Sequence, residues 1–234
     1  MRQPRDDEGV LICGRRGSGK TQEALDQFSQ RSFDEIPWIL LDFKGGDLVS
    51  RMPCSDRPSI RDPVPTEPGV YIVSAEVEDH QRGGPVNSYL LQIFKQGNVG
   101  VVIDELGQVG QNSQGLRLIL TQGRSKRIPF IFCCQRPVNI DMWALSESEF
   151  IQVFNLQFQN DRDRIHEYIP EDKLNFDELR DLGKYHSVVW HYDADEITFY
   201  GPCRRFEDIY DHTLRRLPKY EEIPTPDPDQ RVRV

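Results

Sequence analysis

A chain of 234 residues is long enough for one α/β domain and too short to add a large accessory domain to it. Hydrophobic residues make up 37% of the chain and aromatic residues 10%, which excludes a disordered chain because enough apolar surface exists for a core. The formal charge of -9 argues, taken alone, against a general nucleic-acid-binding protein. We expect residues 1–217 to form a single domain and the proline-rich, charged residues 218–234 to form an extended tail.

Signals for membrane insertion, disulfides and structural metals are missing from the sequence. There is no run of about eighteen apolar residues, and the polar start MRQPRDDEG does not resemble a signal peptide. We therefore expect a soluble, intracellular protein with no transmembrane segment of its own. The five cysteines lack disulfide or metal-ligand spacing, so reduced thiols are predicted. The five histidines likewise form no ligand pattern.

Short apolar runs alternate with helical periodicities along most of the chain. This alternation indicates an α/β fold, in which a mainly parallel sheet is covered by helices on both faces. The predicted elements, in chain order, are a strand at 10–13, a helix with apolar positions 24, 25 and 28, strands at 38–43 and 70–73, a helix around 89–94, a strand at 99–103, a helix around 116–123, strands at 129–134 and 150–158, a helix around 161–168, and a late hairpin of strands at 187–190 and 197–200.

A phosphate-binding pattern follows the first predicted strand. The pattern G-x-x-x-x-G-K-[ST], which requires a strand before it and a helix after it, matches Gly14-Arg15-Arg16-Gly17-Ser18-Gly19-Lys20-Thr21. Its glycines let successive backbone N–H groups point at phosphates, and the helix N-terminus adds a partial positive charge. We expect Lys20 to reach the β- and γ-phosphates of ATP and the Thr21 hydroxyl to ligate Mg²⁺.

Two adjacent acids, Asp104 and Glu105, follow the predicted strand at 99–103. The carboxyl ends of parallel strands share the edge at which a phosphate loop opens. Asp104 is therefore expected to hold Mg²⁺ through its water shell, and Glu105 to act as general base on the attacking water. A solvated strand end is the structural alternative. Because most P-loop kinases of small molecules need no second acid of this kind, the pair favours hydrolysis over phosphoryl transfer to a metabolite.

The strand at 129–134 begins after the basic segment Arg124–Arg127 and ends in Gln135-Arg136-Pro137. This arrangement resembles the FtsK/HerA superfamily of ring-forming, DNA-pumping P-loop ATPases of the ASCE/RecA-like fold, in which the corresponding strand ends in a polar sensor. The run Leu41-Asp42-Phe43-Lys44-Gly45-Gly46-Asp47 is also similar to a strand end of conjugative coupling ATPases in that superfamily. The resemblance covers residues 10–137.

The resemblance implies roles for Gln135 and Arg124. Gln135 is expected to sense the γ-phosphate, since an amide can donate to a phosphate and accept from a water; a strand-capping amide is the alternative. Arg124 matches the position from which the superfamily offers an arginine finger to the neighbouring subunit's nucleotide, and a guanidinium suits the spread charge of phosphoryl transfer. Arg127 is the second candidate, and an ordinary solvated charge is the alternative for each.

Length selects within the superfamily, because its helicases and chromosome pumps carry extra domains. The sequence resembles the compact genome-packaging ATPases of icosahedral viruses with an internal membrane. That resemblance implies an ATP-hydrolysing translocase of double-stranded DNA, working as a ring, expected to be a hexamer. Its partner would be a capsid vertex or a membrane-embedded portal protein, with the ATPase in the host cytoplasm or attached to the virion at a packaging vertex.

Three other functions stay open at this point. A conjugation or plasmid coupling ATPase is favoured by the run at 41–47, a P-loop small-molecule kinase would need an arginine-rich lid at 124–136, and a non-catalytic P-loop scaffold would need no catalytic residues. The loops at 80–84 and 108–113 are candidates for DNA contact, with ordinary solvated loops as the alternative.

The negative charge is unevenly distributed along the chain. Residues 1–140 hold 17 basic and 17 acidic residues, whereas residues 141–234 hold 12 and 21. The segment 106–140 has five basic residues and no acid. The net charge therefore does not exclude DNA, and we expect the C-terminal part to face away from it.

Overall fold

The structure, a computed structural model, describes residues 4–5, 7–43, 45, 48–76, 79, 84–110, 112–170 and 172–218. Lys44, Gly46 and Asp47 of the coupling-type run lie outside the described residues, as do most of the first candidate DNA loop (80–83), Gln111 of the second, and the tail from 219 onward.

Eight strands of the described part form one sheet in the order β3-β2-β4-β5-β1-β6-β7-β8. Pairing is parallel from β3 to β6, and β7 and β8 complete the sheet as an antiparallel hairpin. The predicted mainly parallel sheet with a late hairpin is confirmed. The strands are β1 (Val10–Cys13), β2 (Pro37–Asp42), β3 (Gly69–Ser74), β4 (Gly100–Ile103), β5 (Phe130–Cys134), β6 (Phe150–Phe154), β7 (Ser187–His191) and β8 (Glu196–Tyr200).

Helices connect the strands, and four of them match predicted positions (α1, α2, α3 and α5). The helices are α1 (Lys20–Phe28), α2 (Pro85–Gln96), α3 (Gln114–Gln122), α4 (Met142–Ser146), α5 (Gln159–His166), α6 (Phe176–Asp181) and α7 (Phe206–Arg216), with 3₁₀ turns η1 (Val49–Arg51), η3 (Leu106–Gln108), η4 (Arg124–Lys126) and η5 (Pro137–Asn139). The strand predicted at 150–158 ends at Phe154, because its partner β1 ends at Cys13, opposite Val153, and the next carbonyl, of Asn155, accepts from the Arg15 N–H of the following loop.

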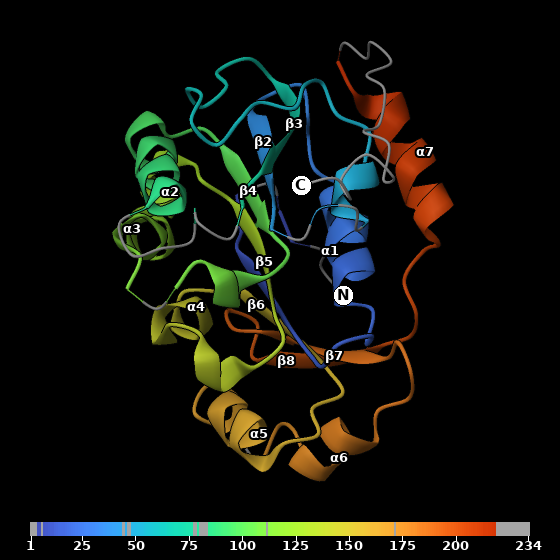
Figure 1. Cartoon of the computed structure of the whole chain (residues 1–234). Helices are drawn as coiled ribbons and strands as arrows, with labels where there is room; N and C mark the ends of the chain where they lie inside the picture. The colour runs from blue at the N-terminus through green and yellow to red at the C-terminus, as the bar shows by residue number, and fades with distance from the viewer. Residues whose placement is uncertain are drawn as a thin grey trace, which may run out of the picture.

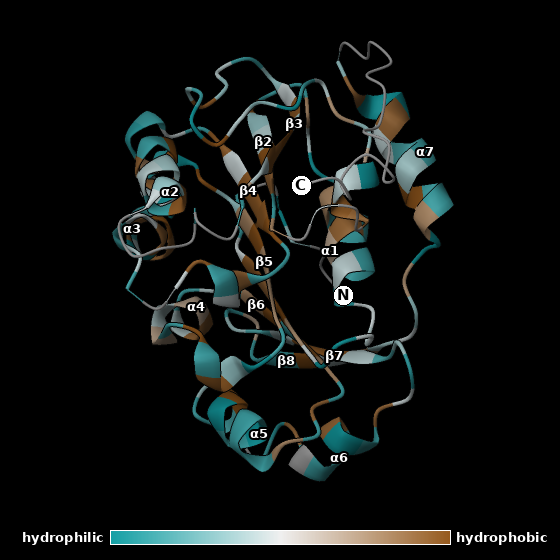
Figure 2. Ribbon diagram, in the orientation of Figure 1, coloured by the Kyte–Doolittle hydropathy of each residue, from teal (hydrophilic) through white to brown (hydrophobic). Residues whose placement is uncertain are grey.

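Helices cover both faces of the sheet (Figure 1). On one face α2 and α3 bury Tyr89, Leu90 and Ile119, and on the other α1 and α7 bury Phe28 and Ile209. Hydrophobic residues are concentrated on the central strands, whereas α5 is largely hydrophilic (Figure 2). Continuous burial of the strands explains their unbroken apolar sequences. In the part of the chain that the structure describes, no helix is long and apolar enough to cross a membrane.

Strand register places the ends of five strands along one edge of the sheet. Ile103 pairs with Phe132, Cys13 pairs with Cys134, and Phe154 pairs with Ser187, where the antiparallel β7 begins. The loops at this edge therefore follow the strand order: the β4 end, the β5 end, the loop between β1 and α1, the β6 end, and the chain entering β7. The crevice outside the carboxyl ends of parallel strands is where such sheets bind ligands.

Candidate functional site

The loop between β1 and α1 has the backbone of a phosphate cradle. Gly17 and Gly19 have φ values of +76° and +103°, a conformation that only glycine adopts without strain. The loop begins between two strands, because the Gly14 N–H donates to the Cys134 carbonyl at 3.1 Å and the Arg15 N–H to the Asn155 carbonyl at 3.3 Å. The start of the loop is therefore held by the ends of β5 and β6.

Two side chains of this loop are available to an anion. The Lys20 ammonium is buried and donates to the Arg15 carbonyl at 3.0 Å, within the loop itself. The Ser18 hydroxyl is buried and has no hydrogen-bond partner among the described residues. A buried hydroxyl without a partner is costly, and a phosphate oxygen would satisfy it. The α1 N-terminus, the Lys20 cation and the open backbone N–H groups together favour a bound phosphate chain.

Thr21 and Asp104, far apart in the sequence, meet beside this loop. The Thr21 hydroxyl donates to Asp104 Oδ1 at 2.6 Å, and Asp104 is buried. A hydroxyl and a carboxylate are hard oxygen donors, which suit Mg²⁺. No group of three or more His, Cys, Asp or Glu side chains suited to a metal occurs among the described residues.

Glu105 and Gln135 form the second pair that the strand order brings together. The Gln135 side-chain amide donates to Glu105 Oε2 at 2.5 Å, and Glu105 is buried. The contact joins the β4 end to the β5 end beside the phosphate loop. An amide in this position can hold the carboxylate of a general base and can also turn to a phosphate.

Lys20, Thr21, Glu105 and Gln135 line one cavity of about 610 Å³. Sequence reasoning identified the loop residues, Glu105 and Gln135, but it did not identify Gln22, Leu48 or Tyr185 as lining residues. No local motif marks these three, and Tyr185 reaches the cavity only because β7 pairs with β6. The lining consists of Arg16, Gly17, Gly19, Lys20, Thr21, Gln22, Leu48, Glu105, Gln108, Gln135 and Tyr185.

Comparison with known proteins assigns the chain to a family. No family model matches the sequence. The chain is 32% identical over 209 residues to the DNA packaging ATPase P9 of Enterobacteria phage PRD1, and the match covers 86% of this chain and 90% of that protein. The chain belongs to the viral DNA packaging ATPases. The predicted resemblance to compact viral genome-packaging ATPases is confirmed.

Solved structures share the fold of this packaging ATPase. The genome packaging NTPase B204 of Sulfolobus turreted icosahedral virus 2, in complex with ATP-gammaS, has a TM-score of 0.67 at 20% identity, covering 86% of this chain and 100% of that one. The conjugation coupling protein TcpA of pCW3 has a TM-score of 0.50 at 15% identity, covering 83% of this chain and 59% of that one. The P-loop NTPase fold is confirmed.

Arg124 of the packaging ATPase lies away from its own nucleotide cavity. It belongs to η4, which precedes β5 and so lies at the amino edge of the sheet, opposite the phosphate loop. Its side chain is 69% exposed and lies 3.6 Å from Glu149 Oε1. Arg127, the second candidate, is exposed on the same turn and has a φ of +54°. Neither residue lines the nucleotide cavity.

Other predicted positions have structural contacts. The Asp42 carboxylate accepts from the Gly45 N–H at 2.9 Å, so it shapes the turn after β2. In the second candidate DNA loop, Gln108 lines the nucleotide cavity, and the Ser113 hydroxyl caps α3 by accepting from the Leu116 N–H at 3.2 Å. The side chains of Arg15 and Arg16 are exposed, and Arg16 lines the cavity.

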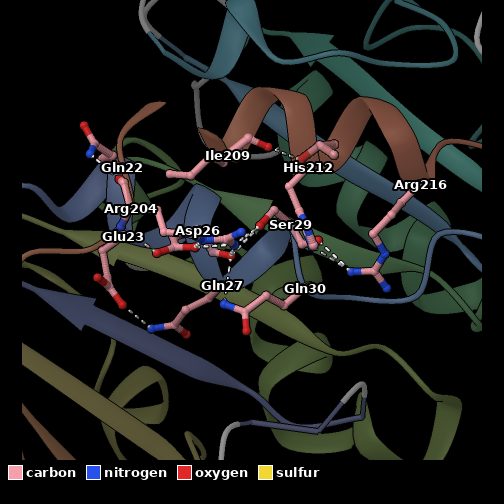
Figure 3. A network of polar contacts seen from close by, with 11 residues as sticks. Gln22, Glu23, Asp26, Gln27, Ser29, Gln30, Arg204, Ile209, His212 and Arg216 are labelled. Carbon is pink, nitrogen blue, oxygen red and sulfur yellow. Dashed lines mark hydrogen bonds and ion pairs between the residues drawn. The ribbon is translucent and has the colours of Figure 1, made fainter. Parts of the chain in front are cut away.

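The segment just before α7 contacts helix α1, which carries Lys20 and Thr21 (Figure 3). The Arg204 guanidinium contacts Asp26 Oδ1 at 2.5 Å and donates to the Ser29 hydroxyl at 2.7 Å. The Gln22 amide donates to the Arg204 carbonyl at 2.6 Å. No motif in the sequence predicts these contacts between α1 and the segment before α7.

Proposed function

We propose that the chain is an ATP-driven translocase that moves double-stranded DNA into a viral capsid. The observation that carries the proposal is the Glu105–Gln135 contact beside the phosphate loop, in a chain of the viral DNA packaging ATPase family. A small-molecule kinase has no use for a second acid held by an amide next to the γ-phosphate position. Residues 1–217 act in this proposal as a single ATPase domain, with residues 218–234 as its tail.

Hydrolysis requires a base for water and groups that stabilise the phosphoryl charge. Glu105 accepts the proton of the attacking water, and Lys20 and the loop N–H groups stabilise charge on the phosphates. Thr21 and Asp104 would hold Mg²⁺, which would supply further neutralisation of the phosphate charge when bound.

Gln135 links the nucleotide to the rest of the molecule. Its amide bonds to Glu105 in this structure, and a γ-phosphate offers it a second acceptor. The adjacent Arg136 contacts the buried carboxylate of Asp161 in α5 at 2.5 Å. A shift of the β5 end would therefore pass directly to α5, which gives the sensor a mechanical output.

The complete motor is proposed to be a ring, expected to be a hexamer. Arg124 lies at the amino edge of the sheet, so it can act as a finger only in trans, on the nucleotide of a neighbouring subunit. Head-to-tail contacts of this kind form a ring when the rotation from one subunit to the next closes on itself. The ring would act in the host cytoplasm at a packaging vertex, on a capsid or portal protein.

Steady-state ATPase activity, measured with and without duplex DNA and alongside solution mass, tests the proposal. We expect DNA to stimulate hydrolysis by an oligomer, and Glu105→Gln to lower kcat by about 10²- to 10⁴-fold while the fold is retained. Glu67→Gln, at an exposed acid, is the matched control. Near-normal hydrolysis by Glu105→Gln would show that the assigned base is wrong. An active monomer without any response to DNA would favour the kinase instead.

A further inference from the structure

The strand order gives the nucleotide cavity a direction. Glu105 and Gln135 follow β4 and β5 on one side of β1, whereas β6 and β7 lie on its other side. The γ-phosphate must lie near Glu105 for water to attack it. The loop backbone cradles the α- and β-phosphates, and Lys20 reaches the β- and γ-phosphates. The base of the nucleotide therefore extends away from Glu105, toward the β6 and β7 side of the cavity.

Tyr185 is the aromatic side chain of the cavity lining, and it stands on that side. It precedes β7, and its ring packs against Gly19, where a Cβ would come within 3.1 Å of Tyr185 Cδ1. The Lys184 ammonium lies 4.7 Å from the ring centroid and helps to hold the ring in place. Nevertheless 42% of Tyr185 is exposed. The ring is thus held at the mouth of the cavity without being buried.

The backbone at Tyr185 is unusual for an aromatic residue. Its φ of +65° is a left-handed conformation that glycine or asparagine adopts more easily. The turn is closed by the His186 N–H, which donates to the Gly183 carbonyl at 3.0 Å. Residues in strained backbone conformations cluster at active sites and ligand-binding segments. Packing alone does not explain a half-exposed tyrosine here.

The turn is also tied to the phosphate loop. The Asn155 carbonyl accepts from the Arg15 N–H at 3.3 Å, and the Asn155 amide donates to the Leu182 carbonyl at 3.4 Å. One residue at the β6 end therefore fixes both the beginning of the phosphate loop and the segment that leads to Tyr185.

We propose that the Tyr185 ring is the platform on which the nucleotide base stacks. The inference rests on the proposed function only in taking ATP as the nucleotide. Stacking on an aromatic ring is tolerant of base identity, because every base offers a flat π-face. Tyr185 therefore contributes affinity for the nucleoside part and little discrimination between adenine and guanine.

Binding of ADP and of inorganic triphosphate, compared in one set of variants, tests this platform. We expect Tyr185→Ala to weaken ADP about tenfold and to leave triphosphate affinity unchanged, with Tyr185→Phe close to wild type. Tyr192→Ala, at an exposed tyrosine of the β7–β8 turn, is the matched control. A Tyr185→Trp variant should show fluorescence quenching by ADP but not by triphosphate.

Any other result of these binding and fluorescence measurements would contradict the proposal that the base stacks on Tyr185. Equal weakening of ADP and triphosphate by Tyr185→Ala would mean that the ring only holds the phosphate loop. Unchanged ADP affinity in this variant, or no quenching in Tyr185→Trp, would place the base elsewhere. Neither assay needs hydrolysis or DNA, so both can fail while the translocase proposal stands. If wild-type protein bound no nucleotide at all, the translocase proposal itself would fall.

Discussion

Glu23 is a partly buried residue in the first turn of α1, and ionisation of its carboxyl group lowers the stability of the folded state. It stands one turn after Lys20 in α1, where the Gln27 amide donates to it at 3.0 Å. Burial raises the pKa of Glu23 above its usual range, and the nearby Asp26 adds to this effect. The hydrogen bonds from Gln27 and Gln152 act in the opposite direction without cancelling it.

The raised pKa predicts a pH-dependent effect of Glu23→Gln. Between the unfolded pKa and the higher folded pKa, the folded state binds more protons, so the free energy of unfolding falls as pH rises through this window. The amide cannot ionise and keeps the acceptor for Gln27. We expect Glu23→Gln to melt at a higher temperature than wild type at pH 7.5, and the difference to disappear near pH 4. Thermal melts at both pH values check this, with the exposed Glu207→Gln as control.

At the scale of elements, Arg204 and Arg216 hold α1 in place through contacts that we call the brace. Arg204 contacts the Asp26 carboxylate and the Ser29 hydroxyl, and Arg216 of α7 donates to the Ser29 carbonyl at 2.8 Å. Because α1 carries Lys20, motion of this brace would reach the phosphate loop. The contacts join the last described helix to the first.

Removal of the brace predicts a loss of stability. Arg204→Ala leaves the buried Asp26 carboxylate without its cation, and we expect the free energy of unfolding to fall by about 2 kcal/mol. Chemical denaturation measures this, and Arg205→Ala, at the exposed neighbour, should stay within about 0.5 kcal/mol of wild type. Equal effects of the two variants would show that Arg204 does not act through Asp26.

Local patterns were enough to predict some elements and not others. The phosphate loop and the strands at 38–43 and 99–103 have long apolar runs or a complete motif, so each could be predicted from its own residues. Helix α4 spans only Met142–Ser146, too short for a periodicity. Helix α7 has a signal that the prediction missed, with Phe206 and Ile209 on its buried face, acids in its first turn and arginines in its last.

Some residues of the candidate site could likewise be predicted from the sequence, and others could not. Lys20, Thr21, Asp104 and Glu105 stand in recognisable motifs, and parallel strand order alone brings them to one edge. Tyr185 could not be predicted as a cavity residue, because its position depends on the antiparallel pairing of β7 with β6. Residues that are brought together only by the pairing of distant strands cannot be recognised from a local pattern in a single sequence.

At the scale of the whole molecule, the position of Arg124 predicts that two neighbouring subunits together form each complete active site. Arg124→Ala should bind nucleotide normally and hydrolyse it slowly, and Glu105→Gln should do the same for a different reason. A mixture of the two should regain activity, because a Glu105→Gln subunit can offer Arg124 to the intact base of its neighbour. At equal amounts, about a quarter of the interfaces are productive in a head-to-tail ring.

The control is the same mixture made with Arg127→Ala. Recovery only in the Arg124 mixture identifies that residue as the finger, whereas recovery only in the Arg127 mixture transfers the role to Arg127. If Arg124→Ala alone kept wild-type turnover, or neither mixture recovered, Arg124 would be an ordinary surface charge paired with Glu149.

The position of β1 in the sheet determines when during synthesis the nucleotide site can exist. The phosphate loop leaves the ribosome early, yet its strand pairs with two late ones, Val10 lying opposite Ile131 on one side and Phe150 on the other. Such distant pairings form slowly, after the intervening chain has been made. A nascent chain that ends before β5 would therefore carry the complete motif without the cradle. ATP cannot guide the first stages of folding, and the chain becomes competent for nucleotide only after β5 and β6 have been made.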